Sequence, residues 1–291
     1  MDANRGYYAV PPPNPATAPM CLIVIAWQQH AGFPLVIAAN RDEYHARPSE
    51  AAAFWRTQPR LLAGRDLLAG GTWLGLTRGG RFAAITNRRG HEAPAGAPSR
   101  GMLTLDFLLG DDTPGHYAER LAADCERYAG FNLLVGEVHG ELHYLGNHGP
   151  RLERLPPGVY GLSNAMLDTP WPKLLGAREE VAALLAGDPD PGRVLAVLAD
   201  RGVPPDHALP ATGVGLDQER LLGPRFVCSA QYGTRTSTCV RVRRDGQADF
   251  TERRFDPAGM PQATVQYAFG LDWAACDDPG AWRWLRTRGT P

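Results

Sequence analysis

Residues 21–43 read CLIVIAWQQHAGFPLVIAANRDE, and this stretch contains two short apolar runs on either side of a turn. Residues 21–27 and 35–39 are continuous apolar runs rich in β-branched side chains, a pattern typical of buried strands. Residues 30–34, which lie between them, combine Gly with Pro and predict a turn. The polar tetrad Asn40-Arg41-Asp42-Glu43 follows the second run directly. We therefore expect a hairpin whose second strand ends in polar residues at the edge of a sheet.

The rest of the chain alternates between strand patterns and helical patterns. Strand patterns cover residues 72–77, 82–86, 131–136, 141–145, 160–162, 225–228, 234–242, 248–254 and 264–268. Helical spacing covers residues 102–109, 113–128, 173–185 and 191–200. Strands at both ends with helices between them predict an antiparallel α+β layered domain. Since no repeat and no internal linker is visible, we expect one domain.

The composition excludes several classes of function. With 44% hydrophobic and 21% charged residues and a net charge of −1, the chain has no electrostatic basis for binding nucleic acid or an anionic membrane. No segment approaches the roughly 18 uninterrupted apolar residues of a membrane span. The five cysteines lie far apart and form no Cys-x-x-Cys pair, which argues against a disulfide framework or a zinc site. We expect a cytoplasmic protein. Arg outnumbers Lys by 29 to 1, which we interpret as codon bias.

The two ends of the chain differ from its centre. Prolines cluster at residues 11–13 and 15, and no apolar core of a signal peptide is present. We expect residues 1–19 to form a disordered arm, residues 20–275 a single domain and residues 276–291 a C-terminal tail. Met20 directly precedes the first strand pattern, so we expect that translation begins there.

Cys21 is the first candidate for chemistry. If Met20 is the initiator and is removed, Cys21 carries both a thiol and a free α-amine. An α-amine has an ordinary pKa of roughly 7.7–8.0, so it can act as the base for the thiol. The alternative is that Cys21 is a small buried hydrophobic residue that opens a strand.

The polar tetrad and two asparagines are further candidates. Arg41 can stabilise a thiolate or bind an anionic group, and Asp42 can hold an α-amine; the alternative is a solvated turn with a local salt bridge. Asn87 and Asn164 follow strand patterns, where a side-chain amide can donate to an oxyanion, although Asn also caps turns. Arg235 follows a glycine and either points into the same cleft or is a structural cross-strand residue.

Two other sequence patterns do not match a phosphate-binding loop or a metal site. Residues 70–75, Gly-Gly-Thr-Trp-Leu-Gly, lack the Lys of a phosphate loop, and we expect their glycines to allow close backbone approach beside the active end of the sheet. His139 and His143 flank a predicted hairpin turn, which does not suit a helical metal pair. We therefore expect no metal site.

The motifs together resemble the NRDE family, also called the transport-and-Golgi-organisation family. The resemblance rests on Met20-Cys21, Ala39-Asn40-Arg41-Asp42-Glu43, Arg47-Pro48, Phe54-Trp55, Gly70-Gly71-Thr72-Trp73-Leu74-Gly75, Thr86-Asn87, Phe131-Asn132-Leu133, Tyr160-Gly161-Leu162-Ser163-Asn164-Ala165, Thr169-Pro170-Trp171, Tyr232-Gly233-Thr234-Arg235-Thr236 and Thr251-Glu252-Arg253. These motifs occur in order from Met20 to about Phe269 and so cover nearly the whole chain.

That family is similar to the N-terminal-nucleophile hydrolases, which implies a four-layer αββα sandwich with antiparallel sheets. The cholylglycine-hydrolase and penicillin-acylase branch uses an N-terminal Cys, an Arg and an Asp after the second strand, and two Asn residues. The resemblance implies the catalytic set Cys21, Arg41, Asp42, Asn87 and Asn164, with the asparagines as oxyanion donors. It also implies that binding involves Asn40, Glu43, Trp73 and Arg235.

Two departures from the branch bear on function. Arg41 and Asp42 are adjacent here, whereas the branch places them three apart, so Glu43 is an alternative anchor for the amine. While residues 1–20 remain attached, Cys21 has an amide nitrogen and lacks its base.

Three hypotheses follow. The first is a cysteine-dependent enzyme that hydrolyses an amide or a thioester without a required cofactor. The second, implied by the association of the family's animal members with haem mobilisation and acyl-CoA and lipid homeostasis, is a carrier that binds haem or an acyl-CoA without turnover. The third is a structural interaction protein with a relic cleft.

Overall fold

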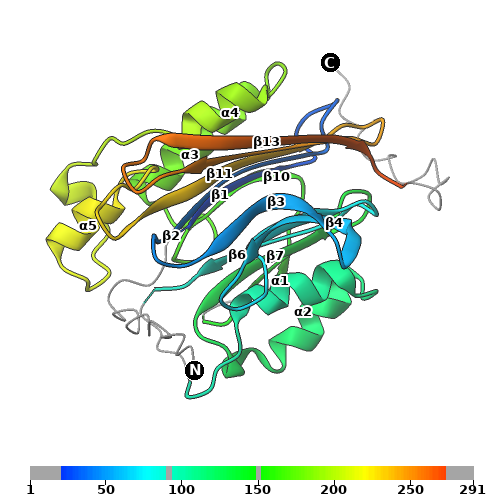
Figure 1. Ribbon diagram of the computed structural model, residues 1–291, viewed down its shortest axis with the longest axis horizontal. Coiled ribbons are helices and arrows are strands. Elements are labelled where there is room, and N and C mark those ends of the chain that lie inside the picture. The colour runs from blue at the N-terminus through cyan, green and yellow to red at the C-terminus, as the bar shows by residue number, and fades with distance from the viewer. Residues whose placement is uncertain (1–20, 90–93, 149–151, 273–291) are drawn as a thin grey trace, which may run out of the picture.

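The computed structural model describes residues 21–89, 94–148 and 152–272, which fold into two antiparallel sheets with helices on both outer sides (Figure 1). The first sheet has the order β10 (Gly158–Leu162), β1 (Cys21–Trp27), β2 (Leu35–Tyr44), β11 (Tyr232–Val242), β12 (Gln247–Phe255) and β13 (Pro261–Gly270). The second has the order β3 (Ser49–Trp55), β4 (Gln58–Asp66), β5 (Leu74–Thr77), β6 (Arg81–Asn87), β7 (Phe131–Glu137), β8 (Leu142–Gly146) and β9 (Leu152–Arg154).

Five helices in the described part of the chain complete the layers. Helices α1 (Arg100–Leu109) and α2 (Pro114–Ala122) cover the second sheet, and α3 (Pro172–Leu184) and α4 (Pro191–Leu198) cover the first, with α5 (Leu216–Leu222) beside them (Figure 1). The predicted α+β class and its αββα layer order are confirmed by this arrangement.

Side-chain alternation along the central strands divides the interior into three cores. Ile23 and Ile25 of β1 face the second sheet, whereas Leu22 and Val24 face the helices α3 and α4. A third core lies between the second sheet and the helices α1 and α2. Because both faces of β1 are covered, its sequence is continuously apolar rather than alternating.

Several elements differ from the sequence-based expectations. The strands β3 and β4 and the helix α5 were not predicted, because their short segments are rich in Ala or charged residues and lack a clear apolar period. The helix expected over residues 113–128 ends at Ala122, and a separate 3₁₀ turn follows at Cys125–Arg127. The strand expected at residues 225–228 was wrong, since only an isolated bridge joins Cys228 to Gly233.

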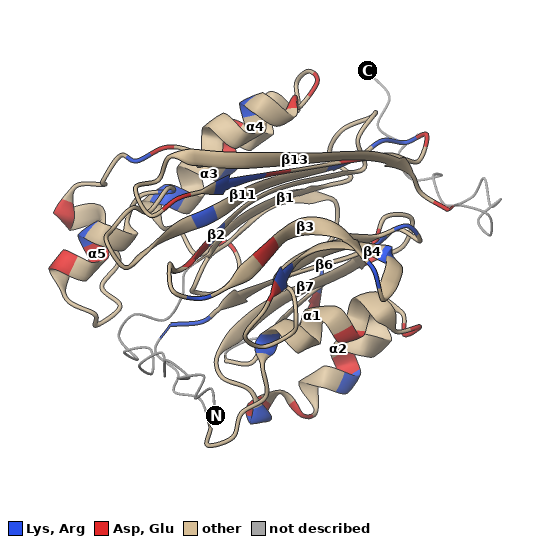
Figure 2. Ribbon diagram, in the orientation of Figure 1, with Lys and Arg blue, Asp and Glu red and all other residues tan. Residues whose placement is uncertain are grey.

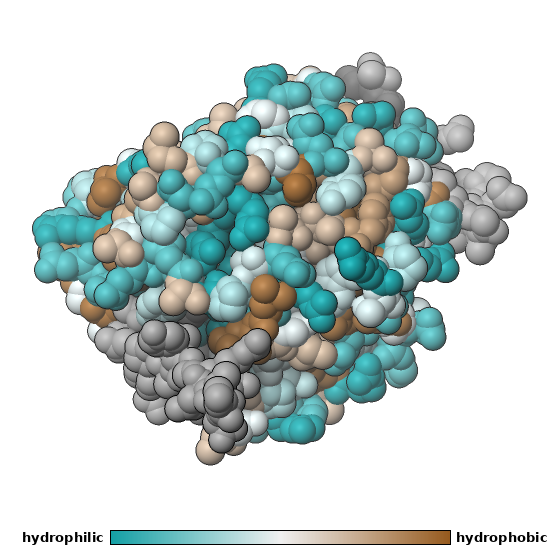
Figure 3. Space-filling model, viewed as in Figure 1, coloured by the Kyte–Doolittle hydropathy of each residue, from teal (hydrophilic) through white to brown (hydrophobic). Residues whose placement is uncertain are grey.

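Surface properties agree with the near-neutral composition. Charged residues of both signs lie on the outer helices (Figure 2), and hydrophilic residues cover most of the face drawn in Figure 3. Within the described ranges, no helix is long and apolar enough to cross a membrane. The predicted arm at residues 1–19 and tail at residues 276–291 lie outside the described residues.

A buried carboxyl group joins the two sheets and gives a prediction for stability. Glu252 of β12 is 1% exposed, and its Oε1 accepts a hydrogen bond of 2.8 Å from the backbone N–H of Ala52 on β3. Burial raises the pKa of Glu252 from 4.5 to about 7. The folded state therefore binds more protons than the unfolded state between these pH values, so the free energy of unfolding falls as pH rises through this window.

We expect Glu252→Gln to remove roughly 3 kcal/mol of this pH dependence, because an amide cannot ionise. Urea unfolding of both proteins at pH 5 and pH 8 measures the difference. Glu50→Gln, which changes an exposed carboxyl group on β3, is the matched control. Equal pH slopes in wild type and Glu252→Gln would contradict the assignment.

Candidate active site

A cavity of about 340 Å³ opens where β1 and β2 meet the second sheet and the N-terminus of α1. This volume is at the lower end of the range for small-molecule sites. Its lining residues are Cys21, Arg41, Asp42, Glu43, Arg47, Asp66, Ala69, Thr72, Trp73, Ile85, Asn87, Ala97, Pro98, Ser99, Arg100, Gly101 and Ala129. The cavity thus brings together six of the nine residues predicted for catalysis or binding.

Cys21 lies at the start of β1, where it pairs with Arg41 of β2. Its side chain is 8% exposed, and burial raises the pKa of the thiol to about 12, helped by the charge of Asp42. A hydrogen bond from the Asp42 backbone and the charge of Arg41 act in the opposite direction. With its nitrogen in a peptide bond, Cys21 is therefore a protonated thiol at neutral pH.

The loop after β10 fixes the backbone of Cys21. The nitrogen of Cys21 donates to Asn164 Oδ1 at 3.2 Å, and Ser163 Oγ donates to the carbonyl of Cys21 at 2.8 Å. Asn164 Nδ2 donates to the carbonyl of Asn87 at 2.7 Å. Asn164 does not line the cavity, and both ends of its amide are engaged. In the structure Asn164 holds the nitrogen of Cys21 through its Oδ1, and its expected role as an oxyanion donor remains a prediction. Asn87 does line the cavity.

Asp42 is held from the next strand. Its Oδ1 accepts a hydrogen bond of 2.7 Å from Thr234 Oγ1, and the carboxyl group is 1% exposed. Its Oδ2 is buried and accepts no hydrogen bond from any described residue. Burial raises the pKa of Asp42 to about 7, although Lys173, Thr234 and Arg41 oppose this.

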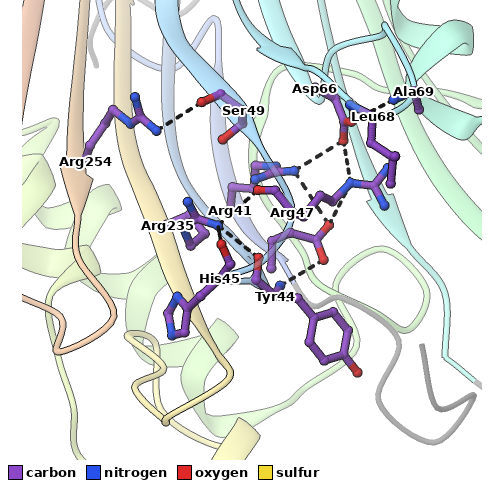
Figure 4. A network of polar contacts seen from close by, with 11 residues as sticks. Arg41, Tyr44, His45, Arg47, Ser49, Asp66, Leu68, Ala69, Arg235 and Arg254 are labelled. Carbon is purple, nitrogen blue, oxygen red and sulfur yellow. Dashed lines mark hydrogen bonds and ion pairs between the residues drawn. The ribbon is translucent and has the colours of Figure 1, made fainter. Parts of the chain in front are cut away.

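A network of ion pairs fixes Arg41 on the other face of β2. Its guanidinium group lies 4.4 Å from the ring centroid of Trp73, and its Nη2 lies 3.4 Å from Asp66 Oδ2 and 3.6 Å from Glu43 Oε2. Arg47 Nε reaches the same Asp66 oxygen at 2.6 Å (Figure 4). Glu43 is thus engaged by two arginines, which leaves Asp42 as the better candidate for an amine anchor.

Two predicted binding residues lie away from the cavity. Asn40 faces the helical layer, where its Nδ2 donates to the carbonyls of Leu198 and Arg225 at 2.9 and 2.8 Å. Arg235 is the extra residue of a β-bulge between Thr234 and Thr236, and its Nη1 donates to three carbonyls of the turn after β2 (Figure 4). Neither residue lines the cavity, and the expectation that they bind ligand remains a prediction. Of the two alternatives for Arg235, the structure favours the cross-strand structural one.

Sequence reasoning missed several residues around the site. Arg47 and Asp66 carry no local motif for chemistry, and Arg100 belongs to a helix that the prediction began two residues later. Burial lowers the pKa of Arg100 to about 10. The close approach expected of the glycines is confirmed, because a Cβ on Gly71 would lie 2.4 Å from the carbonyl carbon of Gly101. This contact lets the N-terminus of α1 form one wall of the cavity.

Sequence comparison agrees with this arrangement. A family model described as "Transport and Golgi organisation 2" matches residues 20–257. The chain belongs to the transport and Golgi organisation 2 family. It is 37% identical to the transport and Golgi organization protein 2 homolog of Bos taurus over 272 residues, in an alignment that covers 85% of this chain and 99% of the relative. The Homo sapiens homolog is 36% identical and the Drosophila melanogaster protein 28% identical, over 80% and 82% of this chain and 92% and 95% of the relatives.

This member of the transport and Golgi organisation 2 family is also similar to solved structures of low sequence identity. Penicillin V acylase from Agrobacterium tumefaciens has a TM-score of 0.49 and 11% identity, with 86% of each chain covered. A mutant of conjugated bile acid hydrolase from Clostridium perfringens has a TM-score of 0.44 and 8% identity, over 87% of this chain and 92% of that one. The αββα layer order of this family member is established by its own two sheets and the helices that cover them.

Proposed function

We propose that the chain hydrolyses an amide or a thioester bond through an acyl intermediate on Cys21, with the α-amine of the same residue as the base. The observation that carries the proposal is the environment of the Cys21 nitrogen. It donates to Asn164 Oδ1, and Asp42, which lines the same cavity and whose charge acts on the Cys21 thiol, has a buried Oδ2 without a partner among the described residues. An α-ammonium group on Cys21 would supply the donors that this oxygen lacks.

The chemistry needs only proton transfers and one nucleophile. The thiol proton of Cys21 moves to the α-amine, and Sγ attacks the carbonyl carbon of the substrate. The C–N or C–S bond breaks, and the leaving group takes the proton from the α-ammonium. Water then attacks the acyl group while the α-amine accepts a proton from it, and the bond to Sγ breaks. The thiolate regains its proton as the acid product departs.

Other cavity residues would stabilise the oxyanion, activate the thiol and contact the acyl group. Asn87 lies on the cavity wall, where an amide can stabilise the oxyanion, and one such donor contributes about 2.7–4 kcal/mol to lowering the barrier. Arg41 places a fixed positive charge that lowers the pKa of the Cys21 thiol. Trp73, Ile85 and Ala129 give part of the wall an apolar character suited to an acyl group. A reducing, cytoplasmic location would keep the thiol free.

The proposal requires that Cys21 becomes the first residue of the protein. N-terminal sequencing and intact mass of the native protein test this requirement, followed by iodoacetamide labelling resolved by peptide. We expect an N-terminus at Cys21 and labelling at least about tenfold faster than at Cys125 or Cys239, because an adjacent amine lowers the barrier to thiolate formation. Native protein that retains residues 1–20 and labels Cys21 no faster would rule out the hydrolase.

Ligand binding without turnover is a second candidate, and one observation favours it. While the nitrogen of Cys21 is peptide-linked, the thiol has a pKa of about 12 and is no nucleophile. The cavity still offers guanidinium groups of Arg41, Arg47 and Arg100 to an anionic ligand such as an acyl-CoA. Haem fits less well, because the described lining residues include neither His nor Met as an axial ligand and the Cys21 thiol is protonated.

A further inference from the structure

Lys173 is the only lysine of the chain, and it occupies an unfavourable position for a cation. It is the second residue of α3 and is 6% exposed. The N-terminus of a helix carries a partial positive charge, and the positive charge of Arg89 acts on Lys173 in the same direction. Burial alone favours a neutral amine at such a place.

The direct contacts of Lys173 are with neutral groups, the carbonyl of Leu222 and the ring of Trp171, whose centroid lies 6.0 Å from Nζ. Its Nζ donates to the carbonyl of Leu222 at 2.9 Å, which a neutral donor would do equally well. In the part of the chain that the structure describes, no carboxylate lies within 4.0 Å of it. Two other buried arginines close to the start of α3 are themselves paired: Arg89 with Glu219, and Arg225 with Glu180 and Asp200.

Asp42 is the buried carboxylate that balances this charge. Alternation along β2 places Asp42 on the face toward α3, whereas Arg41 and Glu43 face the second sheet. Burial raises the pKa of Asp42, and the charge of Lys173 opposes this effect. Burial lowers the pKa of Lys173, and the charge of Asp42 opposes that effect. Neither residue has an ion pair within 4.0 Å among the described residues, so each depends on the other at longer range.

A small set of charged groups surrounds Asp42 and Lys173. The charges of Lys173 on α3 and of Arg41 and Glu43 on its own strand act on Asp42, and Thr234 on β11 donates a hydrogen bond to it. Lys173 faces Asp42, Arg89, Glu219 and the thiol of Cys21. Arg89 and Glu219 form an ion pair of 2.9 Å and largely cancel each other. Lys173 is therefore the principal positive charge on the helical side of Asp42.

We propose that Lys173 is a positioning residue of the Cys21 site, which supplies from the helical layer the positive charge that balances the buried carboxylate of Asp42. An ionised Asp42 can hold the α-ammonium group that forms when the thiol proton moves to the nitrogen of Cys21. This last step rests on the proposed function.

The test follows the titration of Asp42 by carboxyl ¹³C NMR of the full chain, with the signal assigned by its absence in Asp42→Asn. In Lys173→Gln, which keeps a donor for Leu222 but loses the charge, we expect the Asp42 midpoint to rise by about one pH unit. Alkylation of Cys21 by iodoacetamide at pH 7 should slow about tenfold, and recover at higher pH. Arg193→Gln, which removes an exposed cation from α4, is the control and should change neither readout.

An unchanged Asp42 midpoint in folded Lys173→Gln would overturn the proposal and leave Lys173 a purely structural role. If Lys173→Gln does not fold, the double variant Asp42→Asn/Lys173→Gln decides, because removing both charges leaves no unbalanced buried charge. A double variant that folds and shows a cooperative thermal transition supports the proposal, and a double variant that also fails to fold overturns it. A peptide-linked Cys21 would defeat the proposed hydrolase, but the Asp42 midpoint would still decide the role of Lys173.

Discussion

Cys21→Ala is expected to lower kcat/KM for hydrolysis of an N-acyl amide or an acyl thioester by at least about 10³-fold, because it removes the atom that forms the acyl intermediate. The remaining cavity, including Asn87 and Arg41, would still bind the substrate, so the effect should lie in kcat rather than in KM. Steady-state kinetics on a panel of such substrates measures it. Intact mass after rapid acid quenching should show an acyl adduct on wild type and none on the variant.

Cys228→Ala is the matched control for this prediction. Cys228 is also a free thiol, but it is exposed and does not line the cavity. Its substitution should leave both the kinetics and the acyl adduct unchanged. Turnover retained by Cys21→Ala would disprove the proposed nucleophile.

Asp42→Asn is expected to lower kcat at pH 7.5 by about 10²-fold, because general acid–base steps contribute this much and depend here on a held α-ammonium. The substitution preserves shape, and the amide oxygen can still accept from Thr234 Oγ1. A neutral amide cannot stabilise the positive charge that forms on the Cys21 nitrogen. The loss should therefore appear in the chemical step and not in folding, which thermal unfolding will check.

The pH dependence of kcat/KM is expected to report the ionisation of Asp42. Burial raises the pKa of Asp42 to about 7, so protonation on the acid side removes its charge. In wild type, kcat/KM should fall as pH drops below about 7, and Asp42→Asn should lack this limb. Asp217→Asn, which changes an exposed carboxyl group on α5, should keep the wild-type profile. If Asp42→Asn is less active but its kcat/KM still falls below about pH 7 as in wild type, the ionisation belongs to another group.

Much of the fold follows from local patterns. The apolar runs of β1 and β2 and the turn between them are confirmed, because strand and turn preferences act over a few neighbouring residues. The strand β3 was missed because its segment Ser49–Trp55 is only partly buried and rich in Ala, so its pairing with β4 outweighs its weak intrinsic preference.

Part of the candidate site could likewise be predicted from local sequence patterns, and part depends on the tertiary structure. The sequence by itself determined that Cys21 opens a buried strand and that the tetrad Asn40-Arg41-Asp42-Glu43 ends the next one, since both facts follow from hydrophobic pattern alone. Only the tertiary structure decided which side chains of the tetrad face the cavity network and which face the helices. It also decided that Arg235 lies at a β-bulge between Thr234 and Thr236 and donates to backbone carbonyls, and that Lys173 is buried at the start of α3. The physical reason is that strand register, bulges and long-range electrostatics depend on partners far apart in the chain.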